Sequence, residues 1–168
     1  ASAELIQSMR SDFINIGGVL DPHAAYLVLR GMKTYFVRYR EQCSRAQRIA
    51  ELLAAHPAVE RVHYPGLPSH PQHALAKAQM KDFGTIVTFD MKGGPPATAK
   101  FAESLRLFAI TASLGSTESL VMPSQLLGGR DLTAEQKQIA GLGPGIVRLS
   151  VGLEDPEDLL ADVAQALG

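Results

Sequence analysis

The arginine at position 148 is the residue of this sequence whose type and setting most suggest chemistry. It lies within residues 147–151, VRLSV, where apolar side chains alternate with Arg148 and Ser150. A period of two is typical of a strand with one apolar face. A guanidinium fixed on a strand is suited to binding a carboxylate through two parallel hydrogen bonds. The other interpretation is an edge-strand arginine that reaches solvent.

A second candidate is the corner formed by Ser113, Leu114 and Gly115. Serine and glycine are common turn residues, so the pattern alone indicates a turn without a binding role. Glu118 and Ser119 follow the corner closely. We expect them to support the sheet and the corner rather than to act as an acid or a base.

The histidines offer one spacing that resembles a metal site. His70 and His73 are three residues apart, which can place two ligands on one helical face. No third ligand is evident, so the sequence predicts no metal site. His23, His56 and His63 are interpreted as surface or helix-end residues.

The single cysteine, Cys43, cannot form an internal disulfide. Its neighbours in the sequence give no reason for a reactive thiolate, so we expect a structural thiol.

The net charge of −1 gives no reason to expect nucleic acid or an anionic membrane as a partner. No apolar run approaches the roughly 18 residues of a membrane span, and we expect a cytoplasmic protein.

The elements that must position these residues can be read from local signals. Asp-Pro pairs at residues 21–22 and 155–156 predict helix starts, because aspartate caps free amide groups and proline fits the first turn. A long helix from Asp21-Pro22 is interrupted or bent at Arg30-Gly31, and a second follows at residues 33–55 with Phe36, Val37, Ile49, Leu52 and Leu53 on its inner face. Further helices are predicted at residues 72–80, 97–104, 133–139 and 158–167, and strands at 59–63, 84–91, 107–111, 118–121 and 147–151.

Mixed strands and helices with short connections favour an α+β fold. We expect one mostly antiparallel sheet with helices on one face. At 168 residues, with 46% hydrophobic and 20% charged residues, the chain is long enough for one well-formed core.

Four segments resemble, in the same order, the Cys/Met-metabolism enzymes that use pyridoxal phosphate (PLP). This family includes cystathionine γ-synthase, cystathionine γ-lyase, methionine γ-lyase and the homoserine sulfhydrylases. The resemblance runs from about Gly17 to Leu167, and its most specific part is the ten-residue run YPGLPSHPQH. The segments are residues 29–34 (LRGMKT), 64–73 (YPGLPSHPQH), 112–115 with 118–120 (ASLG and ESL) and 147–155 (VRLSVGLED).

The resemblance implies that residues 22–168 are the small C-terminal domain of such an enzyme and that residues 1–21 are an inter-domain lead-in. The family's large N-terminal domain carries the lysine that binds PLP. No lysine of this chain lies in a Ser-x-Thr-Lys context like that of the family, and no glycine-rich turn before a helix offers a phosphate cradle. We therefore expect no catalytic and no cofactor-binding residue here, and no activity from this chain alone.

The resemblance also implies roles for individual residues. Arg148 would hold the α-carboxylate of the substrate, with Ser113 and the Leu114 backbone as the second contact. Ala112 stands where several relatives carry glutamate, which predicts a smaller or less polar distal group on the substrate. Residues 122–130 depart from the family pattern and predict a reshaped substrate-entry loop.

The expected function is therefore substrate-carboxylate binding within a PLP-dependent C–S lyase acting on sulfur amino acids by β- or γ-elimination. The alternatives are γ-replacement, as in cystathionine γ-synthase or a homoserine sulfhydrylase, and a non-catalytic amino-acid-binding module. A purely structural oligomerisation domain is a weaker possibility. The partners implied by the resemblance are the N-terminal PLP domain of the same protein and further copies in a homotetramer.

Overall fold

The computed structural model describes residues 2–127 and 132–168. The chain divides into two compact units, Ala1–Phe36 and Val37–Gly168. This division falls later than the boundary after residue 21 that the sequence suggested. The assignment of residues 22–168 to the small domain of a longer enzyme stays a prediction.

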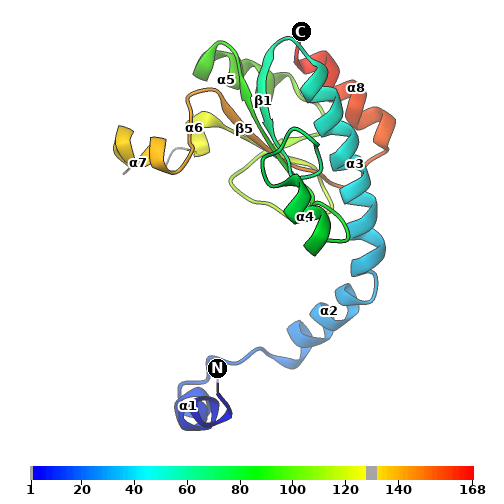
Figure 1. The fold of residues 1–168 in the computed structure, drawn as a ribbon. Coiled ribbons are helices and arrows are strands. Elements are labelled where there is room, and N and C mark those ends of the chain that lie inside the picture. The colour runs from blue at the N-terminus through cyan, green and yellow to red at the C-terminus, as the bar shows by residue number, and fades with distance from the viewer. Residues whose placement is uncertain (1, 128–131) are drawn as a thin grey trace. The chain divides into compact units, whose positions relative to one another are not determined.

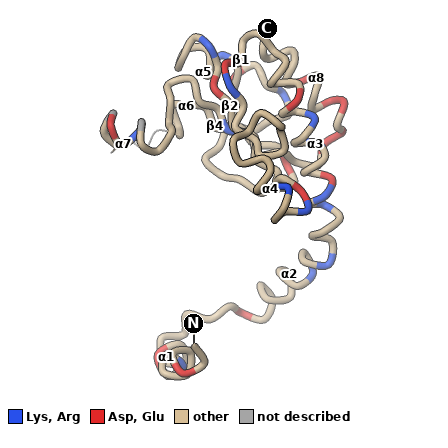
Figure 2. The backbone as a smooth tube through the Cα atoms, in the orientation of Figure 1, with Lys and Arg blue, Asp and Glu red and all other residues tan. Residues whose placement is uncertain are grey.

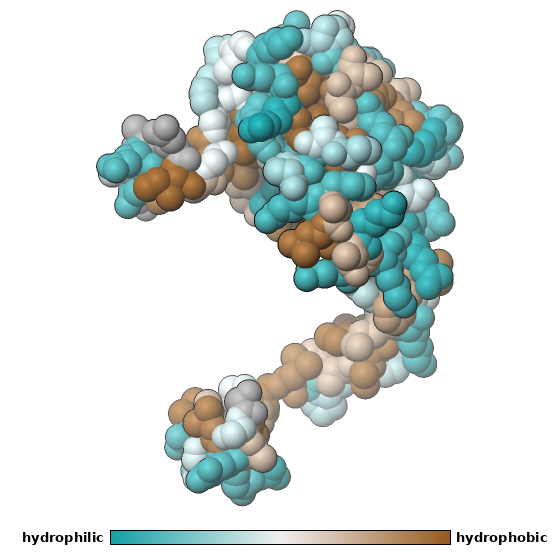
Figure 3. Space-filling model, viewed as in Figure 1, coloured by the Kyte–Doolittle hydropathy of each residue, from teal (hydrophilic) through white to brown (hydrophobic). Residues whose placement is uncertain are grey.

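The first unit consists of two helices, α1 (Ala3–Ile16) and α2 (Pro22–Met32) (Figure 1). Asp21 caps α2 as predicted, because its Oδ1 accepts hydrogen bonds from two backbone N–H groups at 2.9 and 3.1 Å. The predicted interruption at Arg30-Gly31 is wrong, since α2 continues to Met32. Neither helix contains a buried residue, and Figure 3 shows apolar surface on both.

The long helix α3 (Tyr35–Ala55) carries the first part of the core. Ile49 and Leu53 are buried as predicted. Phe36 and Val37 were placed on the same inner face, but they are 72% and 69% exposed. The buried positions of α3 begin only at Gln42, so the apolar pattern of the helix extends beyond the part that packs against the core.

The sheet has five strands in the order β1-β2-β5-β4-β3. All neighbouring pairs are antiparallel except β3 with β4. The predicted α+β class and the mostly antiparallel sheet are confirmed. The strands are β1 (Val59–His63), β2 (Ile86–Met91), β3 (Ala109–Ile110), β4 (Leu120–Pro123) and β5 (Ile146–Ser150).

Local capping chemistry fixes the remaining helices. Asp155 caps α8 through Oδ1, and Thr133 and Gln136 form a capping box at α7. Pro95 and Pro96 belong to the first turn of α5 rather than to a turn before it, since proline suits that position. These helices are α4 (His73–Gln79), α5 (Gly94–Ser104), α6 (Ser124–Leu127), α7 (Ala134–Ile139) and α8 (Pro156–Ala166).

The two faces of the sheet differ in burial. On β2, the buried Val87, Phe89 and Met91 alternate with half-buried residues. The buried side chains join α3, α5 and α8 in one core, so these helices cover the same face of the sheet (Figure 1). Arg148 pairs with Thr88 on β2, and it therefore lies on the opposite, half-buried face.

Charged residues of both signs occur along α3 and elsewhere in the unit Val37–Gly168 (Figure 2). Within residues 2–127 and 132–168, no helix combines the length and the apolar character that crossing a membrane requires.

Candidate functional site

Arg148 lies at the centre of the sheet. Its strand β5 is paired on one side with β2 and on the other with β4, where Arg148 faces Thr88 and Met122. The interpretation of Arg148 as an edge-strand arginine is therefore wrong. The sequence pattern could not show this, because the place of a strand in a sheet depends on pairing with distant segments of the chain. Hydrogen bonding on both sides gives the backbone of Arg148 a fixed position.

Among the described residues, the guanidinium of Arg148 makes one hydrogen bond, in which Nη2 donates to the carbonyl oxygen of Ser113 at 2.9 Å. An arginine side chain has five N–H donors, so most of them remain for a ligand. Ion pairs among the described residues include Arg45–Glu41, Arg48–Glu157 and His63–Asp90. None of them involves Arg148, whose charge thus meets no carboxylate in this part of the chain.

The structure brings the predicted corner against Arg148. Ala112, Ser113 and Leu114 are exposed, and Gly115 has a φ of 78°, in the left-handed region that favours glycine. Within the described chain, neither the Ser113 hydroxyl nor the Leu114 N–H has a hydrogen-bond partner. Donors of this kind beside a guanidinium are suited to the two oxygens of a carboxylate.

Ala112 is a small, uncharged residue directly before the corner. It is exposed, and it follows Thr111, whose N–H donates to the carbonyl oxygen of Val121 on β4 at 3.1 Å. Its predicted role in specificity stays a prediction, as do the roles of Arg148, Ser113 and Leu114 in substrate binding.

Three buried polar residues lie near this site, and the sequence predicted a role for only one of them. Gln42 and Ser150 are 7% and 1% exposed, and Ser119, predicted only as a support, is fully buried. The alternation of Arg148 with Ser150 was the one signal in the sequence, since residues two apart on a strand share a face. The signal was incomplete because their partners come from a loop more than 30 residues away.

Glu118 lies on the exposed side of the corner. It accepts a hydrogen bond from the Ser116 hydroxyl, and this bond lowers the pKa of the Glu118 carboxyl. The carboxylate is therefore the form present at neutral pH, in keeping with a support and not with a general acid.

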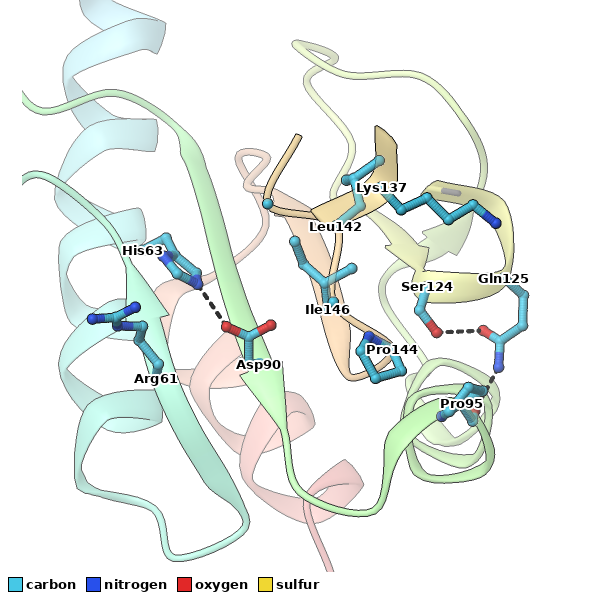
Figure 4. Close-up of a pocket in the computed structure, with 12 residues that line it drawn as sticks. Arg61, His63, Asp90, Pro95, Ser124, Gln125, Lys137, Leu142, Pro144 and Ile146 are labelled. Carbon is cyan, nitrogen blue, oxygen red and sulfur yellow. Dashed lines mark hydrogen bonds and ion pairs between the residues drawn. The ribbon is translucent and has the colours of Figure 1, made fainter. Parts of the chain in front are cut away.

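A hollow of about 690 Å³ lies further along the half-buried face of the sheet (Figure 4). His63 and Asp90 form part of its wall, with His63 Nε2 2.6 Å from Asp90 Oδ2. His63 is thus half-buried and paired, not a surface residue as predicted. Figure 4 shows Ser124 and Gln125 bonded on the other side, so several polar groups of the hollow bind one another. Arg148 does not line this hollow.

The histidines of the Tyr64 loop have local partners. His73 Nδ1 lies 2.8 Å from the carbonyl oxygen of Pro65, and its ring stacks on Phe83. His70 Nδ1 accepts a hydrogen bond from the N–H of Gln72. No group of three or more metal-binding side chains is found where the structure describes the chain.

Cys43 is buried, and burial raises the pKa of its thiol.

The lysine side chains offer no amine enclosed in a pocket, since Lys137 is half-buried and the other lysines are exposed. A lysine that forms an imine works best when it is desolvated in a pocket. The described residues therefore do not fit covalent binding of PLP.

The segment predicted as a substrate-entry loop begins with regular structure. Residues 122–123 end β4, and Ser124–Leu127 form α6. The remainder of the predicted loop, residues 128–130, lies outside the described residues.

Comparison with known protein families matches residues 1–168 to the family described as Cys/Met metabolism PLP-dependent enzyme. L-methionine gamma-lyase of Fusobacterium nucleatum subsp. polymorphum is 45% identical over 90% of this chain and 38% of its own length. Cystathionine gamma-synthase 1, chloroplastic, of Arabidopsis thaliana is 46% identical over 99% of this chain and 30% of its own.

Comparison with solved structures shows that the fold also resembles that of such enzymes. A crystal structure described as a cystathione gamma lyase from Micromonospora echinospora superposes with a TM-score of 0.89 at 42% identity. The match covers 99% of this chain and 43% of that protein. The chain thus spans less than half the length of the relatives it matches.

Proposed function

Because the chain belongs to the Cys/Met metabolism PLP-dependent enzyme family, we propose that it forms the substrate-carboxylate-binding part of a longer PLP-dependent C–S lyase. The lyase would act on a sulfur amino acid by β- or γ-elimination. The bond-breaking chemistry would come from PLP held by a lysine of an N-terminal domain outside this chain. The chain alone would then be inactive.

The observation that carries this proposal is the guanidinium of Arg148, which is fixed on a central strand and meets no carboxylate among the described residues. The single contact to the Ser113 carbonyl orients the side chain without neutralising its charge. A substrate carboxylate would complete the set of partners, with the Ser113 hydroxyl and the Leu114 N–H as further donors.

Gripping the α-carboxylate fixes the orientation of the amino acid. The substrate is then held at one end by this chain, and its reacting bonds are presented in one direction. Such positioning uses binding energy to lower the activation free energy of the reaction, because the reacting groups are already oriented. The small side chain of Ala112 would leave the distal end of the substrate without a charged contact, which favours a smaller or less polar side chain.

A second candidate reaction is γ-replacement, because a relative named as a cystathionine gamma-synthase is 46% identical over 99% of the chain. The carboxylate site serves both reactions equally. Product analysis of the longer enzyme, with and without a thiol nucleophile, distinguishes them: release of an oxoacid marks elimination, and a new thioether marks replacement.

The longer enzyme is proposed to work as a cytoplasmic homotetramer, as the family resemblance implies. Sedimentation of the longer enzyme tests the assembly directly. A monomer or dimer at working concentration would contradict it.

The test of the carboxylate site is Arg148→Ala in the longer enzyme. We expect kcat/KM for the amino acid to fall by at least about 100-fold, since a hydrogen-bonded charged contact contributes about 1.5–3 kcal/mol and arginine can make two. Arg106→Ala is the control, because Arg106 is exposed and its described hydrogen bonds, made by its backbone N–H, go to Asp162 and not to the corner. Affinity and turnover near wild type in Arg148→Ala would contradict the proposal.

Calorimetric titration of the 168-residue chain separates an enzyme part from a non-catalytic module. A part that needs the other domain gives no heat with amino acids. Saturable binding of an amino acid by this chain alone would favour the module.

A further inference from the structure

One strand holds both ends of the corner beside Arg148. Arg148 and Ser150 are two residues apart on β5, so their side chains project from the same face. Arg148 donates to the carbonyl oxygen of Ser113, and Ser150 Oγ accepts the N–H of Gly115, each at 2.9 Å. The first and last residues of the corner are therefore bonded to neighbouring side chains of a single rigid strand.

The bond to Ser150 is partly withdrawn from water. Its acceptor, Ser150, is 1% exposed, whereas the corner that supplies the donor is exposed. A part-buried hydrogen bond holds its geometry more firmly than a fully exposed one. The N–H of Gly115 thus bonds to a buried side chain, while Leu114 remains exposed.

A second contact ties the residue after the corner to the end of β5. Gln42 of α3 donates through Nε2 to the carbonyl oxygens of Ser116 and Val151, at 2.8 and 2.9 Å. Both amide hydrogens of Gln42 are thus used to join the loop to the end of the strand that carries Arg148.

A third set of bonds fixes the return of the loop into β4. Glu154 accepts from the backbone N–H and from the hydroxyl of Ser119, at 2.7 and 2.8 Å. Ser119 Oγ in turn accepts the N–H of Gly152 at 2.8 Å. A Cβ at Gly152 would meet backbone atoms of Thr117 and Ser119 at 2.5 Å, so the close approach requires glycine.

We infer that Ser150 is a positioning residue of the carboxylate site, with Gln42 and Glu154 as its supporting frame. Ser150 holds the corner so that the Ser113 hydroxyl and the Leu114 N–H occupy set positions relative to the Arg148 guanidinium before a substrate arrives. Preorganisation of this kind strengthens binding because the cost of ordering the site is met during folding. The inference rests on the proposed function of Arg148.

The first test uses the longer enzyme with PLP bound. Ser150→Ala is expected to raise KM for the amino acid about 10-fold while kcat changes less than about 3-fold, and Ser150→Thr, which keeps the hydroxyl, restores KM. Thr98→Val is the matched control: Thr98 is fully buried on α5 and bonds Pro95 and Ser124, away from the corner. An unchanged KM in Ser150→Ala, or an equal rise in Thr98→Val, would overturn the inference.

The second test needs no cofactor and uses the 168-residue chain. Amide hydrogen exchange of Gly115 is expected to become at least about 10-fold faster in Ser150→Ala, with core amides such as that of Phe89 unchanged. Unchanged exchange at Gly115 overturns the inference. So does equal acceleration everywhere, because it would show a loss of stability and not of local position.

The two proposals fail in different ways. If Arg148→Ala leaves activity intact, the carboxylate site is wrong whatever happens at Gly115. If Arg148→Ala abolishes activity while Ser150→Ala changes neither KM nor exchange at Gly115, the site stands and the positioning role is wrong.

Discussion

Arg148 shows how a single charged side chain can be kept unneutralised in a well-packed fold. Its neighbours along β5, Val147 and Leu149, are fully buried on the opposite face, so the strand is anchored by the core. The guanidinium projects to the half-buried face, where one carbonyl oxygen orients it. An ion pair there would hold the side chain as firmly but would leave no charge for a ligand.

The shape of the guanidinium matters as much as its charge. In the longer enzyme, Arg148→Lys keeps a positive charge but loses the planar pair of donors that fits a carboxylate. We expect kcat/KM to fall at least about 10-fold, mainly through KM, as measured by initial rates over a range of amino acid concentrations. A lysine variant with at least half of the wild-type kcat/KM would show that charge alone is sufficient.

Tyr64 makes the stability of the unit Val37–Gly168 fall at alkaline pH. Its side chain is fully buried, its hydroxyl donates to the carbonyl oxygen of Gly84 at 3.0 Å, and burial raises its pKa above the ordinary value of 10.0. The folded state therefore favours the neutral phenol. The stabilisation that the neutral phenol of Tyr64 gives the folded state is fully present below pH 10 and is lost as the pH rises above 10. Burial acts in the same direction on Cys43.

Urea unfolding at pH 7 and pH 10.5 measures this effect. Tyr64 is expected to account for about 1 kcal/mol of the free energy of unfolding lost between the two pH values. Tyr64→Phe should show that much less alkaline loss, although it is itself about 1 kcal/mol less stable at pH 7. Tyr26→Phe is the control, because Tyr26 is 60% exposed. An alkaline loss in Tyr64→Phe equal to that of wild type would contradict the assignment.

At the scale of elements, α8 secures the connection between α5 and β3. Asp162 of α8 is 5% exposed and accepts hydrogen bonds from the backbone N–H groups of Arg106 and Leu107, at 2.9 Å each. Gln165 adds a bond to the same carboxylate at 3.1 Å. A helix and a loop more than 50 residues apart are thus joined by one side chain.

Asp162→Ala removes the acceptor for both backbone donors. We expect the free energy of unfolding to fall by about 2 kcal/mol, since hydrogen bonds to a charged group contribute about 1.5–3 kcal/mol and these two are part-buried. Asp158→Ala is the control on the same helix, because Asp158 is exposed. Equal midpoints of urea unfolding for the two variants would contradict the role of Asp162.

The predictable elements are those whose limits depend on nearby residues. Asp21 and Asp155 mark helix starts because an N-cap needs only the next three residues. The exposure of Phe36, the central place of β5 and the bond between Ser150 and Gly115 were not predictable. Each of these depends on which distant segment packs beside it, and alternating or helical patterns do not contain that information.

At the scale of the whole molecule, the two units differ in what they contain. The unit Val37–Gly168 has its own core and sheet, whereas α1 and α2 have no buried residue. Short helices are marginal in water without packing. The exposed apolar side chains of the first unit are therefore the part of this chain whose surroundings in a longer protein matter most for its stability.

The resemblance of four short segments was enough to identify the family, and the matches to relatives agree with it. The resemblance placed the corner and Arg148 in one site, and the structure brings them into contact. It did not extend to the residues that hold the corner, because those are recognised by their contacts and not by a motif.

β5 follows every other strand in the chain, yet it lies between β2 and β4. During synthesis on the ribosome, the earlier strands emerge as two separate pairs that cannot join until residues 146–150 are available. Closing the sheet therefore requires contacts between distant parts of the chain, which are slow to form. The same event brings Arg148 to the corner, so the proposed carboxylate site of a nascent chain can form only when the sheet closes.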